Sequence, residues 1–499
     1  MHPIDIAIFV LYFLSMLGIG FFFFGKNKNT EDYYVGGRNM GSTHIGLSVV
    51  ATDVGGGFSI GLGGLGFVMG IAGSWMLFTG LIGAWLSAVF LIPKVNRLSK
   101  KINLLTFPQL FEYFYSPRVA LLAGIISAIG YIGFTSSQIL AGAKLASATF
   151  PTLSMTQALI IMGVIAVVYT VAGGLKAVIY TDTVQWIILM AGLVFIGLPM
   201  GYYAVGGIAG IREVVRPEML SLANISWQQL VNWSVTIIPI WFVGMTLYQR
   251  IYACRDEQTA RRAWYIAGLF EYPVMAFMGV LLGLFARVGA DQGMFEYMGY
   301  GSPAELDAEM GLPLLLRTVL PAGLTGLMLS AYFSAIMSTA DSCLMAASGN
   351  IVTDILERFF PLKGNERKTL QVSQAATLII GAAALFIAMN MQNVLELMLL
   401  SYAFMVSGLF VPVIGAMYWK RSTPTAAFWA MLLGGGCTMA LIVLDISLPL
   451  GLDANIAGIS LSAISFIILS YLTPPRINQA TLAIKTNKKH EQAQRATIH

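Results

Sequence analysis

Four polar residues, Ser338, Thr339, Asp341 and Ser342, lie together in an otherwise apolar segment of the chain. If this segment is helical, Ser338, Asp341 and Ser342 stand at positions i, i+3 and i+4 and share one face. Hard cations such as Na⁺ prefer carboxylate, hydroxyl and carbonyl oxygens as ligands. A helical serine or threonine can also hydrogen-bond to the carbonyl of its own preceding turn. That alternative explains one hydroxyl but not three beside a carboxylate, so the spacing favours a cation site.

Further ionisable residues lie within or beside apolar segments, where a charge is costly and indicates function by default. Asp182 follows a predicted helix start, so it is either a cation ligand or a helix cap. Asp53 either contacts an ion or caps a broken helix. Glu271 binds substrate or a proton, or faces an aqueous vestibule, whereas Glu396 is close enough to a surface to be solvated. Lys144, in the predicted span at 119–146, is the one basic candidate.

Two apolar segments contain residues that interrupt helices. The run from Ala51 to Ser59 holds three consecutive glycines, each of which costs about 1 kcal/mol relative to alanine in a helix interior. A weaker interruption runs from Pro239 to Gly244, because proline removes an intrahelical hydrogen bond. Freed carbonyls at membrane depth are tolerated only where protein or a cavity satisfies them. Glycines can also serve close helix packing, but three of them beside an aspartate favour a broken helix.

The composition indicates that these segments belong to a membrane protein. Of the 499 residues, 57% are hydrophobic and 11% are charged, whereas soluble domains carry about 25% charged residues. A helix needs about 20 apolar residues to cross the hydrocarbon core. About thirteen segments meet that requirement, at residues 4–24, 44–70, 73–96, 119–146, 155–173, 177–203, 229–250, 262–288, 314–345, 370–389, 393–419, 424–445 and 455–473.

The basic residues predict the orientation of these spans. If the first span begins outside, most of the 29 Lys and Arg residues, Arg250 among them, fall on the cytoplasmic side. We therefore expect a multi-pass protein of the cell membrane with its N-terminus outside and its C-terminus in the cytoplasm. Residues 1–475 would form the transmembrane domain and 476–499 a short basic cytoplasmic tail. The first span lacks the basic region of a cleaved signal peptide, and the net charge of +5 reflects topology and not nucleic-acid binding.

Enzyme motifs have little support in this sequence. Gly57–Gly61 fits the GxSxG pattern and Gly61–Gly66 fits GxGxxG. The first pattern needs a strand–turn–helix with a histidine partner, and the second needs a βαβ unit. Three cysteines without CxxC spacing and four histidines give neither a disulfide framework nor a redox pair. We expect neither enzymatic activity nor a prosthetic group.

Several motifs resemble those of the sodium:solute symporter family, and the likeness runs from residue 4 to about 475. They are Thr30–Arg38, the interruption at Ala51–Gly57, Gly173–Val178 with Thr181–Gln185, and Ser338–Ser342. The resemblance implies an all-α polytopic membrane protein with the LeuT-like 5+5 inverted repeat and broken helices. The repeats would span about 44–203 and 229–419, with the two interruptions in corresponding positions. The proline- and choline-type branches are the most similar.

The resemblance also implies cation ligands. The family's conserved sodium ion is held by backbone carbonyls and two adjacent hydroxyls, which match the carbonyls of Ala51, Val54 and Ala335 and the hydroxyls of Ser338 and Thr339. Some members hold a second sodium ion, and the matching positions are Asp182, Ser338, Asp341 and Ser342. Asp341 stands where such members carry a hydroxyl, and a carboxylate there should strengthen cation binding. Na⁺ is therefore expected as the co-transported ion.

The substrate site is less well defined. Asp53 resembles proline-type members, but Asp53 and Gly244 stand where choline-type members place tryptophans, so an aromatic cage for a quaternary ammonium is incomplete. Phe58 replaces the glutamine with which sugar-binding members engage a hydroxyl. The residues expected around the substrate are Asp53, Gly55, Gly56, Phe58, Gln138, Trp241, Glu271 and Tyr402. For the three aromatic residues, ordinary helix packing is an equally good interpretation.

These observations favour a secondary active transporter that carries a small organic solute into the cell together with Na⁺ by alternating access. An amino acid or a related zwitterion or cation is the favoured solute. The alternatives are a symporter of a carboxylate, sugar or vitamin, a membrane solute sensor on the same fold, and a channel. The expected partners are the solute, Na⁺ and the lipid bilayer, and the oligomeric state stays open.

Overall fold

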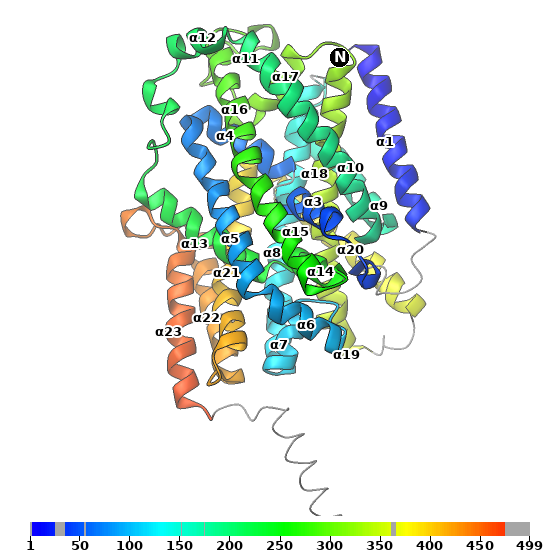
Figure 1. The fold of residues 1–499 in the computed structure, drawn as a ribbon, viewed down its shortest axis with the longest axis vertical. Helices are drawn as coiled ribbons and strands as arrows, with labels where there is room; N and C mark the ends of the chain where they lie inside the picture. Colours follow the sequence, from blue (N-terminus) through cyan, green and yellow to red (C-terminus); the bar gives the residue numbers. More distant parts are fainter. Residues whose placement is uncertain are drawn as a thin grey trace, which may run out of the picture.

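The computed structural model describes residues 2–24, 35–53, 56–150, 152–173, 175–360 and 366–474. These residues form a bundle of helices (Figure 1), and within them the only strand-like pairing is one isolated bridge between Met40 and Cys254. The predicted tail at 476–499 and part of the Thr30–Arg38 motif lie outside the described residues. The described chain thus confirms the all-α fold class.

The first of the two repeats begins with two helical segments on either side of residues 54–55, which lie outside the described residues, and continues through four further spans. Its helices are α3 (Ser42–Asp53), α4 (Gly56–Met69), α5 (Trp75–Phe90), α6 (Ile92–Ile102), α8 (Pro117–Thr149), α9 (Met155–Gly173), α10 (Leu175–Gly192) and α11 (Leu198–Ala204). A short helix, α7 (Pro108–Phe114), precedes α8, and a π-helical turn at Leu193–Gly197 joins α10 to α11.

The second repeat has the same order of elements. Its helices are α13 (Trp227–Val243), α14 (Met245–Ala253), α15 (Glu257–Leu269), α16 (Ala276–Asp291), α18 (Leu324–Gly349), α19 (Glu357–Phe359), α20 (Glu366–Ala388) and α21 (Val394–Tyr418). It starts with a helix in two parts, α13 and α14, which are bent by 42°. The remaining helices are α1 (Pro3–Phe24), α12 (Gly207–Val214), α17 (Ala308–Val319), α22 (Pro424–Val443) and α23 (Ala454–Leu472).

Helix α18 lies at the centre of the bundle. In the apolar window that qualifies it as a span, 94% of the residues are buried, against 28% for the peripheral α23. It contacts α8, α10, α1 and α20. Residues on α18 therefore face protein on nearly every side, so polar groups there must find partners within the bundle.

The described residues contain nine helices that are long and apolar enough to cross a membrane, or ten if the bent pair α13–α14 counts as one span. Several predicted spans agree closely, and α9 has the predicted bounds of 155–173. The predicted span at 314–345 is wrong, because α17 ends at Val319 and α18 begins at Leu324. Pro321 and Gly323, with φ of +89° at the glycine, separate the two helices within continuous apolar sequence.

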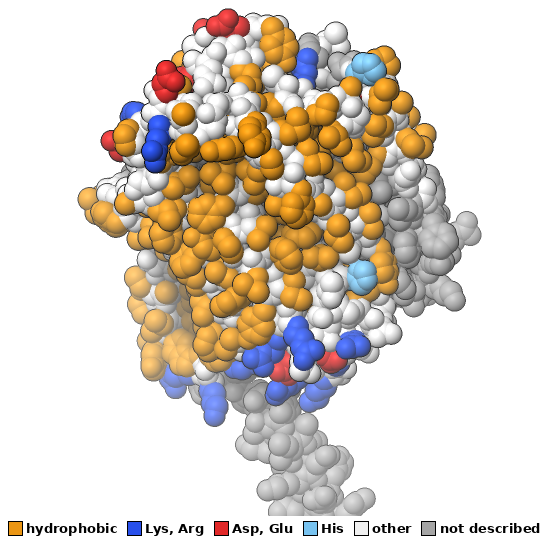
Figure 2. Space-filling view, turned by 45° about the horizontal axis from the view of Figure 1, so that its top comes forward, with side chains coloured by type: hydrophobic (Ala, Val, Ile, Leu, Met, Phe, Trp, Pro, Cys, Tyr) orange, Lys and Arg blue, Asp and Glu red, His pale blue; other side chains and the backbone are white. Residues whose placement is uncertain are grey.

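The surface supports a multi-pass membrane protein. Figure 2 shows a broad apolar belt with Lys and Arg side chains gathered at its lower end. Exposed apolar residues from several helices contribute to such a surface, among them Leu11, Val168, Ile379 and Phe386. In Figure 1, α1 and α23 run in the same downward direction. The first and last spans run in the same direction when the number of membrane crossings is odd, and the predicted orientation requires an odd number of crossings.

Candidate sodium and substrate site

The site is built where α3 and α14 meet α18 and α10. In the first repeat α3 is described to Asp53 and α4 from Gly56, so the interruption expected there stays a prediction. Val54 and Gly55 lie outside the described residues, and the side chains of Asp53, Gly56 and Phe58 are likewise not described.

In the second repeat, α13 and α14 meet at Gly244 with a bend of 42°. Gly244 adopts an extended conformation, with φ of −69° and ψ of 114°. Pro239 lies inside α13, one turn before the bend. The predicted interruption at Pro239–Gly244 is confirmed, with the break at the glycine.

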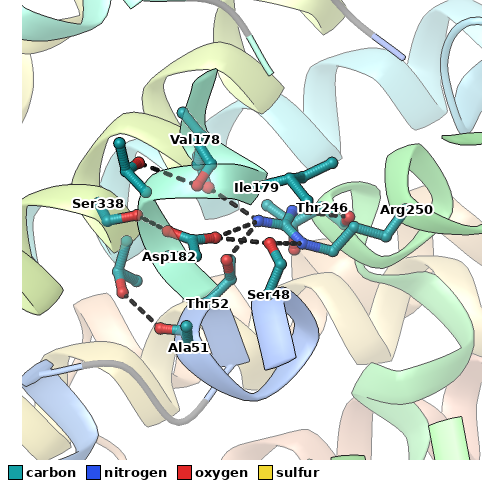
Figure 3. A network of polar contacts seen from close by, with 12 residues as sticks. Ser48, Ala51, Thr52, Val178, Ile179, Asp182, Thr246, Arg250 and Ser338 are labelled. Carbon is teal, nitrogen blue, oxygen red and sulfur yellow. Dashed lines mark hydrogen bonds and ion pairs between the residues drawn. The ribbon is translucent and has the colours of Figure 1, made fainter. Parts of the chain in front are cut away.

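Helix α18 approaches the end of α3 through Thr339. The Thr339 Oγ1 atom lies 3.0 Å from the Ala51 carbonyl oxygen and 3.1 Å from the Ala335 carbonyl oxygen (Figure 3). Thr339 is buried, with 1% of its surface exposed. Three of the five predicted sodium ligands therefore meet at one point, although their sequence positions are almost 300 residues apart.

The fourth described ligand, Ser338, faces the neighbouring helix α10. Its hydroxyl donates a hydrogen bond to Asp182 Oδ1, and Ser48 Oγ of α3 donates to Asp182 Oδ2 over 2.5 Å. Asp182 is fully buried in the middle of α10. The alternative that Asp182 caps a helix start is therefore wrong, since its carboxylate binds side chains of α3 and α18.

Arg250 of α14 completes this cluster. Its Nη2 lies 3.4 Å from Asp182 Oδ2 and 3.1 Å from Ser342 Oγ, and it also donates to Thr52 Oγ1. Its Nε donates to Ser48 Oγ over 3.1 Å, and its Nη1 to the Thr246 carbonyl over 3.2 Å. Figure 3 shows the guanidinium among the side chains of Ser48, Thr52 and Asp182.

Arg250 is the residue that sequence reasoning misplaced. The charge pattern assigned it to the solvated cytoplasmic side, but it has no exposed surface in the structure. A basic residue at the end of a predicted span satisfies the positive-inside rule whether it points outward to water or back into the bundle. The available signal was the unpaired Asp182 in the predicted spans, which needed a partner of opposite charge.

Among the described residues, Asp341 makes no hydrogen bond or ion pair with Arg250. Its Oδ1 accepts a hydrogen bond from Thr170 Oγ1 of α9 over 2.5 Å, and its Oδ2 has no hydrogen-bond partner among the described residues. The predicted second-sodium set therefore divides in two. Asp182, Ser338 and Ser342 gather near Arg250, whereas Asp341 faces α9.

Two of the predicted substrate residues pack against α5. The Trp241 ring lies over Gly83, where an added Cβ would stand 2.4 Å from its Cδ1, and forms an edge contact with Trp264. Glu271 is buried in a π-helical turn at Phe270–Met275, and its Oε2 would lie 2.2 Å from a Cβ at Gly80. Both side chains use the space that glycines leave on one helix.

Two others lie where α8 meets α21. Tyr402 of α21 makes an edge contact with Phe134 of α8, with ring centroids 5.0 Å apart. Gln138 lies one turn after Phe134, and its Nε2 stands 3.2 Å from Ser137 Oγ. The described contacts do not join this pair to Trp241 or Glu271, so the predicted substrate set stays a prediction.

A pocket of about 490 Å³ lies between α4, α13, α17, α21 and α23. None of the predicted substrate residues with a described side chain lines it. The charged residues in its wall are all acidic, namely Glu309, Glu396 and Asp453. Glu396 is exposed, which confirms its predicted solvation. Partial burial raises the pKa of the Asp453 carboxyl above its ordinary value.

Lys144 finds its partners at the edge of this pocket. Its Nζ lies 2.7 Å from Glu309 Oε2 and 2.6 Å from Asp307 Oδ2, both near the start of α17. The Glu309 carboxylate also accepts hydrogen bonds from the backbone N–H groups of Val394 and Leu395, at the start of α21. One buried ion pair therefore fastens α8, α17 and α21 together.

The geometry defines a class before any comparison. A helical membrane bundle with a helix broken at Gly244, and buried polar residues gathered around that break, has the features of secondary transporters with inverted repeats. The family model of the sodium:solute symporter family matches residues 33–434. This chain belongs to the sodium:solute symporter family.

Known relatives agree with this assignment. The chain is 26% identical over 483 residues to the osmoregulated proline transporter OpuE of Bacillus subtilis, covering 93% of this chain and 94% of that protein. It is 27% identical to the sodium/proline symporter of Escherichia coli, covering 93% and 92%. It is also 27% identical to the sodium/glucose cotransporter 1 of Oryctolagus cuniculus, covering 86% and 70%.

A solved structure supports the fold. A Na⁺-coupled sialic acid symporter in a substrate-bound outward-open state superposes with a TM-score of 0.78 at 20% identity, covering 95% of this chain and 98% of that chain. At this identity the likeness concerns the fold alone. The expected LeuT-like architecture and family are confirmed.

Proposed function

We propose that this protein is a Na⁺-coupled symporter that carries a small organic solute into the cell by alternating access. The observation that carries the proposal is the meeting of Thr339 Oγ1 with the carbonyl oxygens of Ala51 and Ala335 in a buried position. Hydroxyl and carbonyl oxygens are the ligands that a hard monovalent cation prefers.

The proposed sodium ligands are the carbonyls of Ala51, Val54 and Ala335 and the hydroxyls of Ser338 and Thr339. The Thr339 hydroxyl has one proton, so it can donate to only one of its two neighbouring carbonyls at a time. When Na⁺ binds, this proton turns away and the oxygen lone pairs face the ion. The Ser338 proton already points to Asp182, which leaves its oxygen lone pairs available.

Coupling follows from the position of these ligands on two different helices. Na⁺ at this point joins α3 to α18, so it favours the conformation in which both helices supply oxygens. A solute that binds beside the interruption then shares that conformation with the ion, and each raises the affinity of the other. Each positive charge that crosses with the membrane potential contributes about 2.3 kcal/mol per 100 mV.

The contacts at the opposite ends of the bundle support alternating access. At the end away from the pocket, Thr106 Oγ1 of the α6–α7 connection donates to Asp354 Oδ1 over 2.8 Å, and Asn350 Nδ2 donates to Ser127 Oγ over 2.6 Å. These bonds hold the π-helical segment Asn350–Leu356, which follows α18, against α8 and the chain that precedes α7. The acidic pocket at the other end would then be the external vestibule, with the basic end in the cytoplasm.

We favour an amino acid or a related zwitterion or cation as the solute. The wall of the pocket carries three carboxylates, of which Glu309 is neutralised by its ion pair with Lys144. Glu396 and Asp453 remain and favour entry of a positively charged group. Proline is the first solute to test, because the names of several relatives state it. A carboxylate, sugar or vitamin, and a solute-sensing role, are the alternatives.

A thermal-stability screen tests the proposal. Purified protein is heated with L-proline, other amino acids, betaines, carboxylates, sugars and vitamins, each in NaCl and in KCl. Ligands that bind only the folded state raise its apparent stability. We expect at least one solute to stabilise the protein in NaCl and not in KCl. Equal effects of all solutes in both salts would contradict Na⁺ coupling. Solute binding without uptake by proteoliposomes would favour the sensor.

A further inference from the structure

We propose that the guanidinium of Arg250 occupies the second cation position, at Asp182, so that this protein binds a single Na⁺ per transport cycle. The inference rests on the proposed Na⁺-coupled function and concerns the number of ions. It starts from the finding that Arg250 lies among oxygens that would otherwise serve a second cation.

Each nitrogen of the guanidinium has at least one acceptor at this position. Nε faces Ser48, Nη1 faces the Thr246 carbonyl, and the two N–H groups of Nη2 are shared among Thr52, Asp182 and Ser342. Four of these acceptors are side-chain oxygens of α3, α10 and α18. A buried ion is retained only where such partners replace its water, so this pocket is built around a cation that the chain itself supplies.

The charges of Asp182 and Arg250 also favour a single sodium ion. Asp182 and Arg250 are both fully buried and form an ion pair. The carboxylate is already neutralised by the guanidinium and accepts further hydrogen bonds from Ser48 and Ser338. A Na⁺ ion placed on the same oxygens would bring two positive charges together in a medium of low dielectric constant, where their repulsion is strong.

The remaining carboxylate of the predicted second-sodium set does not replace Asp182. Asp341 makes its described hydrogen bond with Thr170 on α9 and has no described contact with Arg250, whereas the neighbouring Ser342 accepts from Arg250. Ser342 donates no described bond to Asp341. The oxygens that would have to act together are therefore divided between two places.

Ser338 connects the arginine site to the proposed sodium site. It precedes Thr339 in α18 and donates to Asp182, which in turn binds Arg250. The Arg250–Asp182 ion pair and the Ser338–Asp182 hydrogen bond therefore connect Arg250 to the sodium ligands. We expect variants of Arg250 to change the number of bound ions and also the affinity of the first.

The test counts sodium ions on the purified full-length protein by equilibrium binding of ²²Na⁺. The wild type is expected to bind one ion per chain with a Hill slope near one. In Arg250→Met the freed Asp182 should accept an ion, so that the count rises to two. Adding Asp182→Asn to this variant should return the count to one, and Asp341→Asn alone should leave it at one.

Arg287→Met is the matched control. Arg287 forms an ion pair with Asp291 over 2.9 Å on one partly exposed turn of α16. Neither residue has a described contact with Asp182. Loss of Arg287 removes an arginine from an ion pair without freeing a fully buried carboxylate. The control should bind one ion with unchanged affinity.

Folding of Arg250→Met is itself a readout. Without the arginine, Asp182 is a buried charge that lacks a counterion, so the variant should be recovered in high NaCl and poorly in KCl. The double variant Asp182→Asn/Arg250→Met should be recovered equally in both salts. Recovery of Arg250→Met that is the same in both salts would overturn the assignment.

The outcomes separate the two proposals. Two ions on the wild type, or one ion on folded Arg250→Met, would overturn the assignment of Arg250 and leave Na⁺ coupling intact. No ion on the wild type would overturn the proposed function. One ion on the wild type and two on Arg250→Met would establish the arginine as the substitute for a second sodium.

Discussion

Thr339 Oγ1 stands 3.0 Å from the carbonyl oxygen of Ala51, although 288 positions separate the two residues in the chain. This contact joins the central helix α18 to the last part of α3, before the interruption that the glycine run predicts. Backbone carbonyls near an interrupted helix lack their usual partners inside the helix. A hydroxyl from another helix satisfies one of them and can share it with an ion.

The first prediction concerns this hydroxyl pair. Ser338→Ala with Thr339→Ala removes two of the five proposed ligands, so the Na⁺ concentration for half-maximal stabilisation should rise at least about tenfold, which corresponds to about 1.4 kcal/mol. The measurement is a NaCl titration of the melting temperature. Thr377→Ala is the control, because Thr377 is a buried helical threonine that bonds only to its own helix at Ser373. An unchanged titration in the double variant would remove these hydroxyls from the site.

The second prediction concerns the fit of Trp241 to α5. Gly83→Ala places a methyl group 2.4 Å from the indole Cδ1 and 3.1 Å from the Ile238 Cα. Overpacking of this kind should cost about 1–3 kcal/mol of stability. Gly436→Ala on α22 is the control, because nothing lies within 4 Å of its added Cβ. That variant should be neutral or slightly stabilising in thermal unfolding, and a Gly83→Ala protein as stable as the wild type would show that the indole packs elsewhere.

The third prediction concerns the ion pair at the acidic pocket. Lys144→Met leaves the buried Glu309 without its cation, which should cost about 3–5 kcal/mol of stability. Glu309→Gln in the same chain should recover part of this loss. Arg97→Met is the comparison, because Arg97 is largely exposed in its ion pair with Glu257. This substitution should cost about 0–1 kcal/mol of stability. Equal losses for the two single variants would argue against burial of the Lys144 pair.

The fourth prediction concerns pH and Asp453. Burial raises the pKa of this carboxyl, so the folded state binds its proton more tightly than the unfolded state does. The loss of stability caused by the ionised Asp453 carboxyl is therefore absent at pH values below its pKa in the unfolded state. It grows as the pH rises through its pKa in the folded state. Asp453→Asn should be more stable than the wild type at pH 8, and the difference should shrink toward pH 4. A difference that is constant with pH, measured by thermal unfolding, would exclude titration of Asp453 as its source.

Local signals in the sequence were sufficient for much of the fold. The apolar run at 155–173 gives the bounds of α9, because hydrophobic length alone determines a simple span. The pairing of Pro239 with Gly244 likewise locates the bend between α13 and α14. The break between α17 and α18 carries the same kind of signal in Pro321 and Gly323, but hydrophobic length alone joined the two helices because the sequence around the turn is largely apolar.

The site was predictable only where its residues share a helix face. Ser338, Thr339 and Ser342 are close in sequence, so periodicity identifies them together. The contact of Arg250 with Asp182 joins α14 to α10 and depends on which way a side chain at a span end points. Lys144 was recognised as unusual, but its partners at the start of α17 come from the packing of distant helices.

The central claim is that Na⁺ and a solute cross the membrane together, and uptake by proteoliposomes tests it most directly. Liposomes containing the purified protein and KCl are diluted into NaCl with a radiolabelled solute, L-proline first and then any solute that stabilises the protein in the screen. We predict accumulation above the external concentration under the inward Na⁺ gradient, and loss of accumulation in KCl or in Ser338→Ala/Thr339→Ala. Equal accumulation in KCl and NaCl, or passage of the solute without accumulation, would contradict Na⁺-coupled symport.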